Sequence, residues 1–139
     1  MAEKENKDKN YYIEGIGRRK SSTARVRIYP NQDDSKSEFL VNGDPLEEYF
    51  PIERNAVKAK APFEEIGERH RVTVQAKGGG KTGQAESVQL GLARAIVELD
   101  EDWKPKLKKK DYLTRDAREK EREKPGLRGP RRPQQWRKR

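Results

Sequence analysis

The chain has 139 residues, of which 41% are charged and only 30% belong to the apolar and aromatic set. This length allows one compact domain with an appendage, and the lack of cysteine excludes disulfides and Cys-ligated zinc. A net charge of +9 predicts attraction to a polyanion, either nucleic acid or an anionic membrane surface.

Apolar residues and charge are distributed unevenly along the chain. Residues 11–99 hold 33 apolar or aromatic residues, whereas residues 104–139 hold only 6. Residues 104–139 also carry 16 Lys and Arg against 5 Asp and Glu, so the net positive charge is concentrated there. We therefore predict a flexible leader at residues 1–10, a globular body at residues 11–103 and an extended basic tail at residues 104–139.

The leader carries Glu3, Glu5 and Asp8 and contains no apolar segment. This composition argues against a signal peptide and against an Arg-rich transit peptide. No apolar run in the chain approaches the roughly 18 residues that a membrane-spanning helix needs. We expect a cytoplasmic protein with no membrane partner.

Three strands are predicted at the start of the body. Residues 22–29, STARVRIY, alternate apolar and polar side chains with the period of a half-buried strand. Residues 11–17 and 38–43 are weaker candidates bounded by turn residues. We predict that the three strands are antiparallel, with the acidic residues 31–38 as a solvent-facing extension of the second hairpin. The first turn groups three cations that can meet a phosphate chain, Arg18, Arg19 and Lys20.

Two helices are predicted next. In residues 44–50, Asp44 is a candidate N-cap, Pro45 suits the first helical position and Glu47 completes a near capping box. Residues 52–61 carry apolar residues at helical spacing, and Pro62 is predicted to end that helix.

A strand over residues 69–76 and an amphipathic helix ending near Leu99 complete the body. The order is strand, strand, strand, helix, strand, helix. It predicts an α+β fold, a two-layer sandwich in which a mixed sheet of about four strands is covered by helices on one face.

The glycine-rich residues 78–82, GGGKT, resemble part of a nucleotide-binding loop but fail its spacing. A P-loop ending at Thr82 requires glycine at position 75, which is Gln75. A nucleotide-binding enzyme that uses Gly78 to Thr82 is therefore the weaker alternative. The better interpretation is a strand-to-helix turn whose free amides suit an RNA phosphate, with Lys77 and Lys81 beside it.

The sequence offers little for catalysis or metal binding. His70 is the only histidine, and without cysteine there is neither a His/Cys zinc site nor a thiol nucleophile. We expect His70 to be partly buried and hydrogen-bonded. The chain is predicted to have no enzymatic activity, cofactor or metal site.

The end of the tail reads RRPQQWRKR. Its prolines stiffen the chain, and Trp136 among cations suits stacking on a base or packing on a sugar while the charges hold phosphates. These features argue against a disordered solubility segment or a targeting signal and favour contact with RNA. A nonspecific DNA-compacting protein is the alternative in the same charge class.

Five segments in this order resemble the bacterial form of the small-subunit ribosomal protein nine family. They are GIGRRKSSTARVRIYP, VNGDPLEEYFP, GGGKTGQAESVQLGLARAI, LTRDAREKER and the terminal KR. The resemblance implies a structural protein of the 30S head that contacts 16S ribosomal RNA and neighbouring head proteins. It also implies that the tail threads through the RNA to the anticodon stem-loop of peptidyl-site tRNA.

The candidate ligands follow from charge, position and this resemblance. The tRNA-contacting residues implied by the resemblance are Arg137, Lys138 and Arg139, with Trp136 as the stacking residue. The candidate ligands of ribosomal RNA are Arg18, Arg19, Lys20, Arg25, Lys77, Lys81, Lys108, Lys109, Lys110, Arg115, Arg118, Arg122, Arg128, Arg131 and Arg132.

Overall fold

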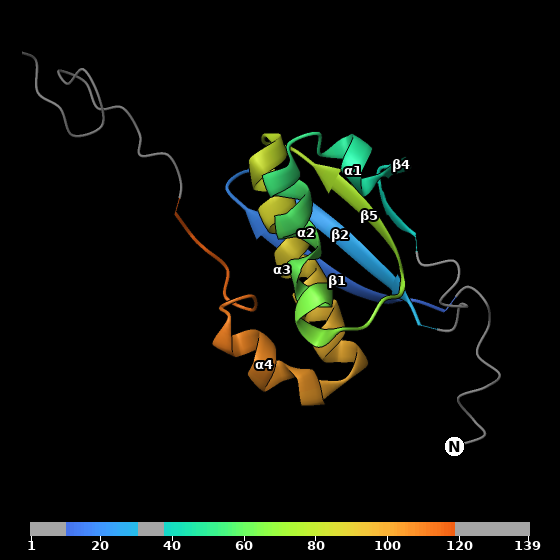
Figure 1. Cartoon of the computed structure of the whole chain (residues 1–139). Helices are drawn as coiled ribbons and strands as arrows, with labels where there is room; N and C mark the ends of the chain where they lie inside the picture. The colour runs from blue at the N-terminus through green and yellow to red at the C-terminus, as the bar shows by residue number, and fades with distance from the viewer. Residues whose placement is uncertain (1–10, 31–37, 119–139) are drawn as a thin grey trace, which may run out of the picture.

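The computed structural model describes residues 11–30 and 38–118. They form one mixed five-stranded sheet with helices packed against it (Figure 1). The strands are β1 (Ile13–Arg19), β2 (Ser22–Tyr29), β3 (Phe39–Val41), β4 (Asp44–Pro45) and β5 (Arg71–Lys77). The helices are α1 (Leu46–Tyr49), α2 (Glu53–Ile66), α3 (Lys81–Leu99), the 3-10 turn η3 (Glu101–Trp103) and α4 (Lys104–Lys109).

The sheet has the strand order β1-β2-β5-β3-β4. β2 pairs antiparallel with β1 and β5, whereas β3 pairs parallel with β5. The α+β fold with a mixed sheet is confirmed. The prediction of three antiparallel strands holds for β1 and β2 but is wrong for β3, which pairs with β4 and β5 and not with β2. β5 lies between β2 and β3 because the crossover through α1 and α2 returns the chain to the middle of the sheet. The acidic segment predicted to extend a second hairpin lies, up to residue 37, outside the described residues.

α2 and α3 cover one face of the sheet and the core lies beneath them (Figure 1). Every second side chain of β2 and β5 points into this core, including Val26, Ile28 and Val72, which are fully buried. α3 contributes the predicted apolar stripe, of which Val88, Leu92 and Ile96 are also fully buried. The other face of the sheet carries no helix among the described residues.

Glycines bring the backbones of β1 and α3 into direct contact. A Cβ on Gly17 would lie 1.7 Å from the Ser87 carbonyl oxygen, and one on Gly15 would lie 2.1 Å from that of Gly91. Both distances are far below van der Waals contact, so only glycine fits these two strand positions. This contact places the first half of α3 against the end of β1.

Two helix boundaries differ from the sequence prediction. Asp44 pairs with Val41 in β4, and α1 starts at Leu46 with no side-chain cap at Pro45. Asn42 and Gly43 have φ angles of 52° and 87°, the geometry of a tight hairpin turn, which draws Asp44 into the sheet instead of into a capping box.

α2 continues through Pro62 and ends at Ile66, with Gly67 in the left-handed conformation after it. A proline inside a helix loses one backbone hydrogen bond and costs about 3 kcal/mol. Here Pro62, Phe63 and Ile66 are all buried, so burial of the last turn offsets that cost.

The chain after residue 103 is not extended at first. Residues 104–109 form α4, in which Leu107 is fully buried, and Tyr112 and Leu113 pack against the core. The folded part of the molecule therefore reaches beyond the predicted boundary at residue 103. Residues 119–139, which hold most of the tail, lie outside the described residues.

Candidate nucleic-acid interface

The face of the sheet that α2 and α3 leave uncovered is the first candidate. We call it the open face and define it by the side chains of β1, β2 and β5 that alternate with the core residues. Five cations stand among them against one carboxylate, Glu14. The cations are Arg18, Arg25, Arg27, Arg71 and Lys77.

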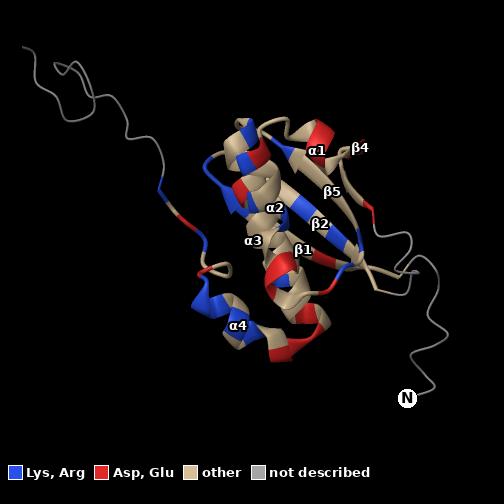
Figure 2. Cartoon of the chain, in the orientation of Figure 1, with Lys and Arg blue, Asp and Glu red and all other residues tan. Residues whose placement is uncertain are grey.

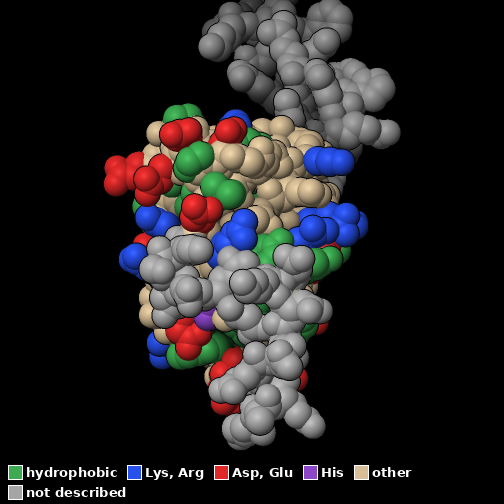
Figure 3. Space-filling view, turned by 90° about the vertical axis from the view of Figure 1, so that its right-hand side faces the viewer, with side chains coloured by type: hydrophobic (Ala, Val, Ile, Leu, Met, Phe, Trp, Pro, Cys, Tyr) green, Lys and Arg blue, Asp and Glu red, His purple; other side chains and the backbone are tan. Residues whose placement is uncertain are grey.

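The register of the strands places three of these cations close together, in neighbouring rows that run across the strands. Arg18 stands opposite Thr23, and Thr23 stands opposite Lys77, so Arg18 and Lys77 flank the same position of β2. Arg25 lies in the adjoining row between Ile16 and Gln75. Figure 2 shows Lys and Arg along β2. Figure 3 shows several basic side chains on the right of the view, where few acidic ones are visible.

Glu14 pairs with two of these arginines. Its carboxylate accepts hydrogen bonds from Arg25 Nε at 2.9 Å and from Arg27 Nε at 3.4 Å. The hydrogen bond from Arg25 and the charge of both guanidinium groups hold the Glu14 pKa below its ordinary value. The Arg25 side chain is still 52% exposed, so its remaining donors are open to solvent.

Two tyrosines extend the open face at the end of the sheet where β1 begins and β2 ends. The rings of Tyr12 and Tyr29 lie 5.9 Å apart and are tilted by 58°. Arg27 lies 4.6 Å above the Tyr12 ring, and Arg71 lies 5.3 Å from the Tyr29 ring. Tyr12 is 41% exposed, so this corner combines π surface with fixed cations.

Four residues of this corner were not predicted from the sequence to be site residues: Tyr12, Tyr29, Arg27 and Arg71. A signal existed, because the alternation of residues 22–29 already put Arg27 and Tyr29 on the polar side of the strand. Tyr29 lies opposite Arg71 because of the register in which β2 pairs with β5. The local sequence pattern does not specify that register.

The turn between β1 and β2 holds the three predicted cations, but their exposure to solvent differs. Arg18 and Lys20 are exposed, and Lys20 adopts a φ of 54° in the turn. Arg19 is folded back and its side chain is only 12% exposed. The expectation of three exposed cations is therefore wrong for Arg19, because carboxylates from α3 and from residue 116 draw it inward.

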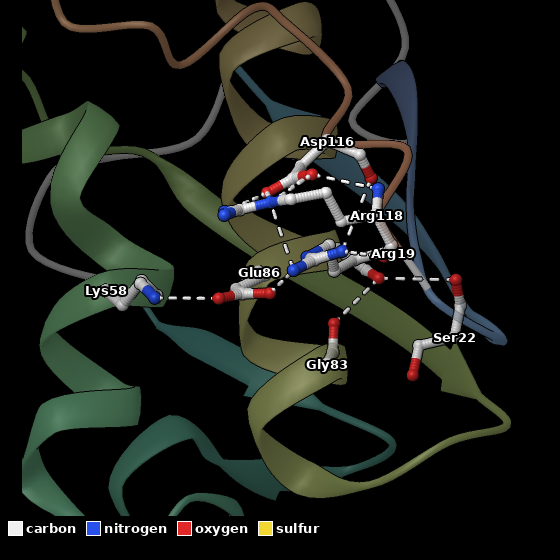
Figure 4. A network of polar contacts seen from close by, with 8 residues as sticks. Arg19, Ser22, Lys58, Gly83, Glu86, Asp116 and Arg118 are labelled. Atoms are coloured by element: carbon white, nitrogen blue, oxygen red, sulfur yellow. Dashed lines mark hydrogen bonds and ion pairs between the residues drawn. The ribbon is translucent and has the colours of Figure 1, made fainter. Parts of the chain in front are cut away.

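Arg19 belongs to a polar cluster that we call the tail-base cluster, made of Arg19, Lys58, Glu86, Asp116 and Arg118 (Figure 4). Glu86 accepts from Arg19 Nε at 2.7 Å and from Lys58 Nζ at 2.9 Å. Burial raises the pKa of Glu86, but the hydrogen bonds from Lys58 and Arg19 outweigh it and the net shift is downward.

The glycine turn before α3 is built around Ser22. The Gly78 carbonyl accepts from Ser22 Oγ at 2.9 Å and from Gln84 Nε2 at 3.0 Å, and Gly78 and Gly79 have φ angles of 76° and 61°. A Cβ on Gly79 would lie 2.1 Å from Ser22 Oγ, so glycine is required there.

Lys77 and Lys81 are exposed on either side of this turn. The Lys81 Nζ lies 3.3 Å from the centre of the Tyr49 ring. This cation–π contact gives Lys81 a preferred position beside the start of α3 while leaving its ammonium group accessible. Both lysines therefore lie beside the glycine turn, and their contact with an RNA phosphate stays a prediction.

His70 is partly buried, as predicted. Its side chain is 17% exposed, its Nε2 lies 3.4 Å from Glu68 and its ring packs 6.1 Å from that of Phe63. Within residues 11–30 and 38–118, no group of three or more His, Asp or Glu is placed to hold a metal ion. No helix in the same residues is long and apolar enough to span a membrane.

The described part of the tail presents a further basic surface, in addition to the open face and the lysines beside the glycine turn. α4 buries Leu107 and exposes the lysines on either side of it, which Figure 2 shows as a basic helix. Lys108, Lys109, Lys110, Arg115 and Arg118 are all exposed. The other predicted ligands lie outside the described residues: Arg122, Arg128, Arg131, Arg132, Trp136, Arg137, Lys138 and Arg139.

Comparison with known proteins agrees with the resemblance seen in the sequence. The family model described as Ribosomal protein S9/S16 matches residues 17–139. A protein of Trichormus variabilis named Small ribosomal subunit protein uS9 is 47% identical over 128 residues, which cover 90% of each chain. A protein of the same name from Mycoplasmopsis synoviae is 46% identical over 127 residues, covering 90% of this chain and 94% of its own. The chain therefore belongs to the ribosomal protein S9/S16 family, a structural and non-enzymatic family, as the five sequence segments predicted.

Proposed function

We propose that this chain is a structural component of the small ribosomal subunit whose body binds 16S ribosomal RNA through the open face. Membership of the S9/S16 family and the name of the relatives support the ribosomal role. The observation that supports the open face is its charge, five cations against one carboxylate on a sheet surface that no described helix covers.

The open face suits a phosphate backbone better than a single small ligand. Arg18, Arg25 and Lys77 stand in adjoining rows of one sheet, so they can contact successive phosphates. Such contacts position RNA and release counterions, which supplies affinity without sequence selectivity. The Tyr12 and Arg27 corner adds a surface on which an unpaired base or a ribose can pack.

The tail has a different role in this proposal. Its cations, including Lys108, Lys109 and Lys110 on α4, neutralise RNA charge along its path through the head. Its last residues, Arg137, Lys138 and Arg139, contact the backbone of the peptidyl-site tRNA, and Trp136 packs on RNA just before them. The partners are 16S RNA, peptidyl-site tRNA and neighbouring proteins of the 30S head in the cytoplasm.

The test of the open face is a triple substitution, Arg18→Ala, Arg25→Ala and Lys77→Ala, with binding to a 16S head fragment measured across salt concentrations. Three lost phosphate contacts should flatten the log-log salt slope by about 2 to 3. The control removes three cations from α2 and the segment after it, with Arg54→Ala, Lys60→Ala and Arg69→Ala, and should leave the slope unchanged.

Equal slopes for the two triple variants would contradict the assignment of the open face. Duplex DNA added as competitor separates the nonspecific alternative. If duplex DNA displaces the RNA fragment at equal nucleotide concentration, the chain is a general polyanion binder and the ribosomal RNA proposal fails.

A further inference from the structure

Arg19 joins three parts of the chain that are far apart in sequence. It is the last residue of β1, its Nε donates to Glu86 of α3, and its other nitrogens reach residues 116–118. We propose that Arg19 is a positioning residue that fixes where the basic tail leaves the body, and that it is not a ligand of ribosomal RNA. This inference rests on the proposed function only for the role of the tail.

The contacts of Arg19 involve all three nitrogens of its guanidinium group. Nε donates to Glu86 Oε2 at 2.7 Å, and Nη2 lies 3.4 Å from Asp116 Oδ2. Nη1 donates to two main-chain carbonyls, those of Asp116 at 3.5 Å and of Arg118. A planar fork with five N–H donors can hold a carboxylate on one edge and a chain segment on the other, which a lysine cannot do.

On the body side, further contacts hold the partner of Arg19 in place. Glu86 is also held by Lys58 of α2 at 2.9 Å (Figure 4), and its helix is pressed onto β1 at Gly17. Arg19 is therefore fixed by elements from both layers of the fold. The energy that such a well-supported partly buried pair contributes is less screened than that of an exposed pair.

The tail side of the contact is a small closed loop. The Asp116 carboxylate accepts from the Arg118 main-chain N–H at 3.0 Å and pairs with its guanidinium group, whose Nη2 lies 2.7 Å from Oδ2. Asp116 thus folds residues 116–118 into a compact turn that presents two carbonyls to Arg19. Two anchoring contacts go to main chain, so the turn is held in position as a unit.

Arg19 is poorly placed to bind RNA. Its side chain is 12% exposed and its three nitrogens already have partners, so a phosphate contact would first have to break the pair with Glu86. The neighbouring Arg18 is exposed and points to the open face. Of these two adjacent arginines, Arg18 is therefore available to bind RNA, and Arg19 holds the chain in position.

The anchor sets the direction of the chain. Residues 104–118 run along the α3 side of the molecule, away from β4 and β5 (Figure 1). A tethered arm finds its target with an effective concentration that depends on where the tether begins and how much of it is free. Releasing residues 116–118 would move the last anchored point of the described chain back to α4.

A distance measurement on the free protein tests this directly. The chain has no native cysteine, so Gln75→Cys on the open face and Ala117→Cys can carry a pair of spin labels without background. Both positions are exposed, and they belong to the body and to the anchored turn respectively. We expect a single narrow distance distribution in the parent and a broad one after Arg19→Gln. The matched control, Arg18→Gln, should keep the narrow distribution.

Asp116→Asn provides a second variant that leaves the core untouched, because Asp116 is on the tail side of the contact. It should broaden the distribution as Arg19→Gln does, and combining the two should add little. A narrow distribution in either single variant would overturn the proposal.

Salt dependence of RNA binding separates positioning from ligand contact. Loss of one phosphate ligand lowers the log-log slope by about 0.7 to 0.9, which we expect for Arg18→Gln and not for Arg19→Gln. A slope loss at Arg19 with an unchanged distance distribution would restore it as an RNA ligand. If the chain failed to bind the RNA at all, the proposed function would fall while the distance result would still stand.

Discussion

The open face and the tail-base cluster draw on the same kinds of residue and use them differently. On the open face, Arg18 and Arg25 keep donors in solvent because no described helix covers the sheet there. In the cluster, Arg19 is enclosed because α3 lies against β1 and supplies Glu86. The role of a cation in this fold therefore depends on whether a neighbouring layer places a carboxylate against it, and not on the local density of charge.

The largest effect should come from Gly17→Ala, which disrupts the contact between β1 and α3 that encloses Arg19. The new Cβ would lie 1.7 Å from the Ser87 carbonyl, so α3 must move away from β1 and carry Glu86 with it. We expect a loss of about 3 kcal/mol or more in unfolding free energy, at the upper end for overpacking. Chemical denaturation measures it.

Gly80→Ala is the control for that substitution. Gly80 has a φ of −100°, and no atom lies within 4 Å of the position that an added methyl group would take, so the change should stay within about 1 kcal/mol. Comparable losses at Gly17 and Gly80 would show that backbone freedom, and not the β1–α3 contact, determines the sensitivity of these positions.

Leu107→Ala should have the next largest effect. Leu107 is fully buried although it lies in the basic tail, so removing its side chain should cost about 2 to 4 kcal/mol. It should also expose the segment that leads to Asp116, so trypsin should cut at Lys108 to Lys110 faster than in the parent. Thermal melting with limited proteolysis checks both expectations.

Lys108→Ala, at an exposed position next to Leu107, should change stability by less than about 0.5 kcal/mol. If Leu107→Ala behaves in the same way, α4 is not part of the folded body and the tail begins at residue 104 after all.

Glu14→Gln changes the open face instead of the cluster, because it removes the only carboxylate among the side chains that define that face. Arg25 and Arg27 lose a shared partner at 2.9 and 3.4 Å and become available to phosphate. We expect a gain of a few-fold in RNA affinity at low salt, equivalent to about 0.5 to 1 kcal/mol. Filter binding at two salt concentrations measures it, and an affinity below that of the parent would count against this surface.

The smallest effect should be a change in acid sensitivity. Because the folded-state pKa of Glu86 is lowered, its ionised form contributes stability above the ordinary carboxyl pKa and loses it as the pH falls through the folded value. The parent should therefore lose stability from about pH 5 downward, and Glu86→Gln should lose less over the same range. Melting temperatures from pH 7 to 3 test this, and parallel curves would show that Glu86 is not linked to folding.

The local elements and the segregation of charge could be predicted from the amino-acid pattern. Alternation in residues 22–29 and the three- and four-residue spacing up to Leu99 specify which side chains are buried, because these patterns need only a nearby core. The same alternation put Arg25 on the polar side of its strand. Five segments were enough to identify the family, which the comparisons confirm.

The strand order, the last turn of α2 and the contacts of Arg19 depend on long-range packing. Alternation reports that a strand has a buried face, but not which strand lies beside it, so the insertion of β5 between β2 and β3 escaped prediction. Pro62 ends a helix unless burial offsets its cost, and Leu107 looks solvated unless a core lies beneath it. Arg19 meets Glu86 across 67 residues of sequence, and a contact at that separation exists only once α3 has docked on β1.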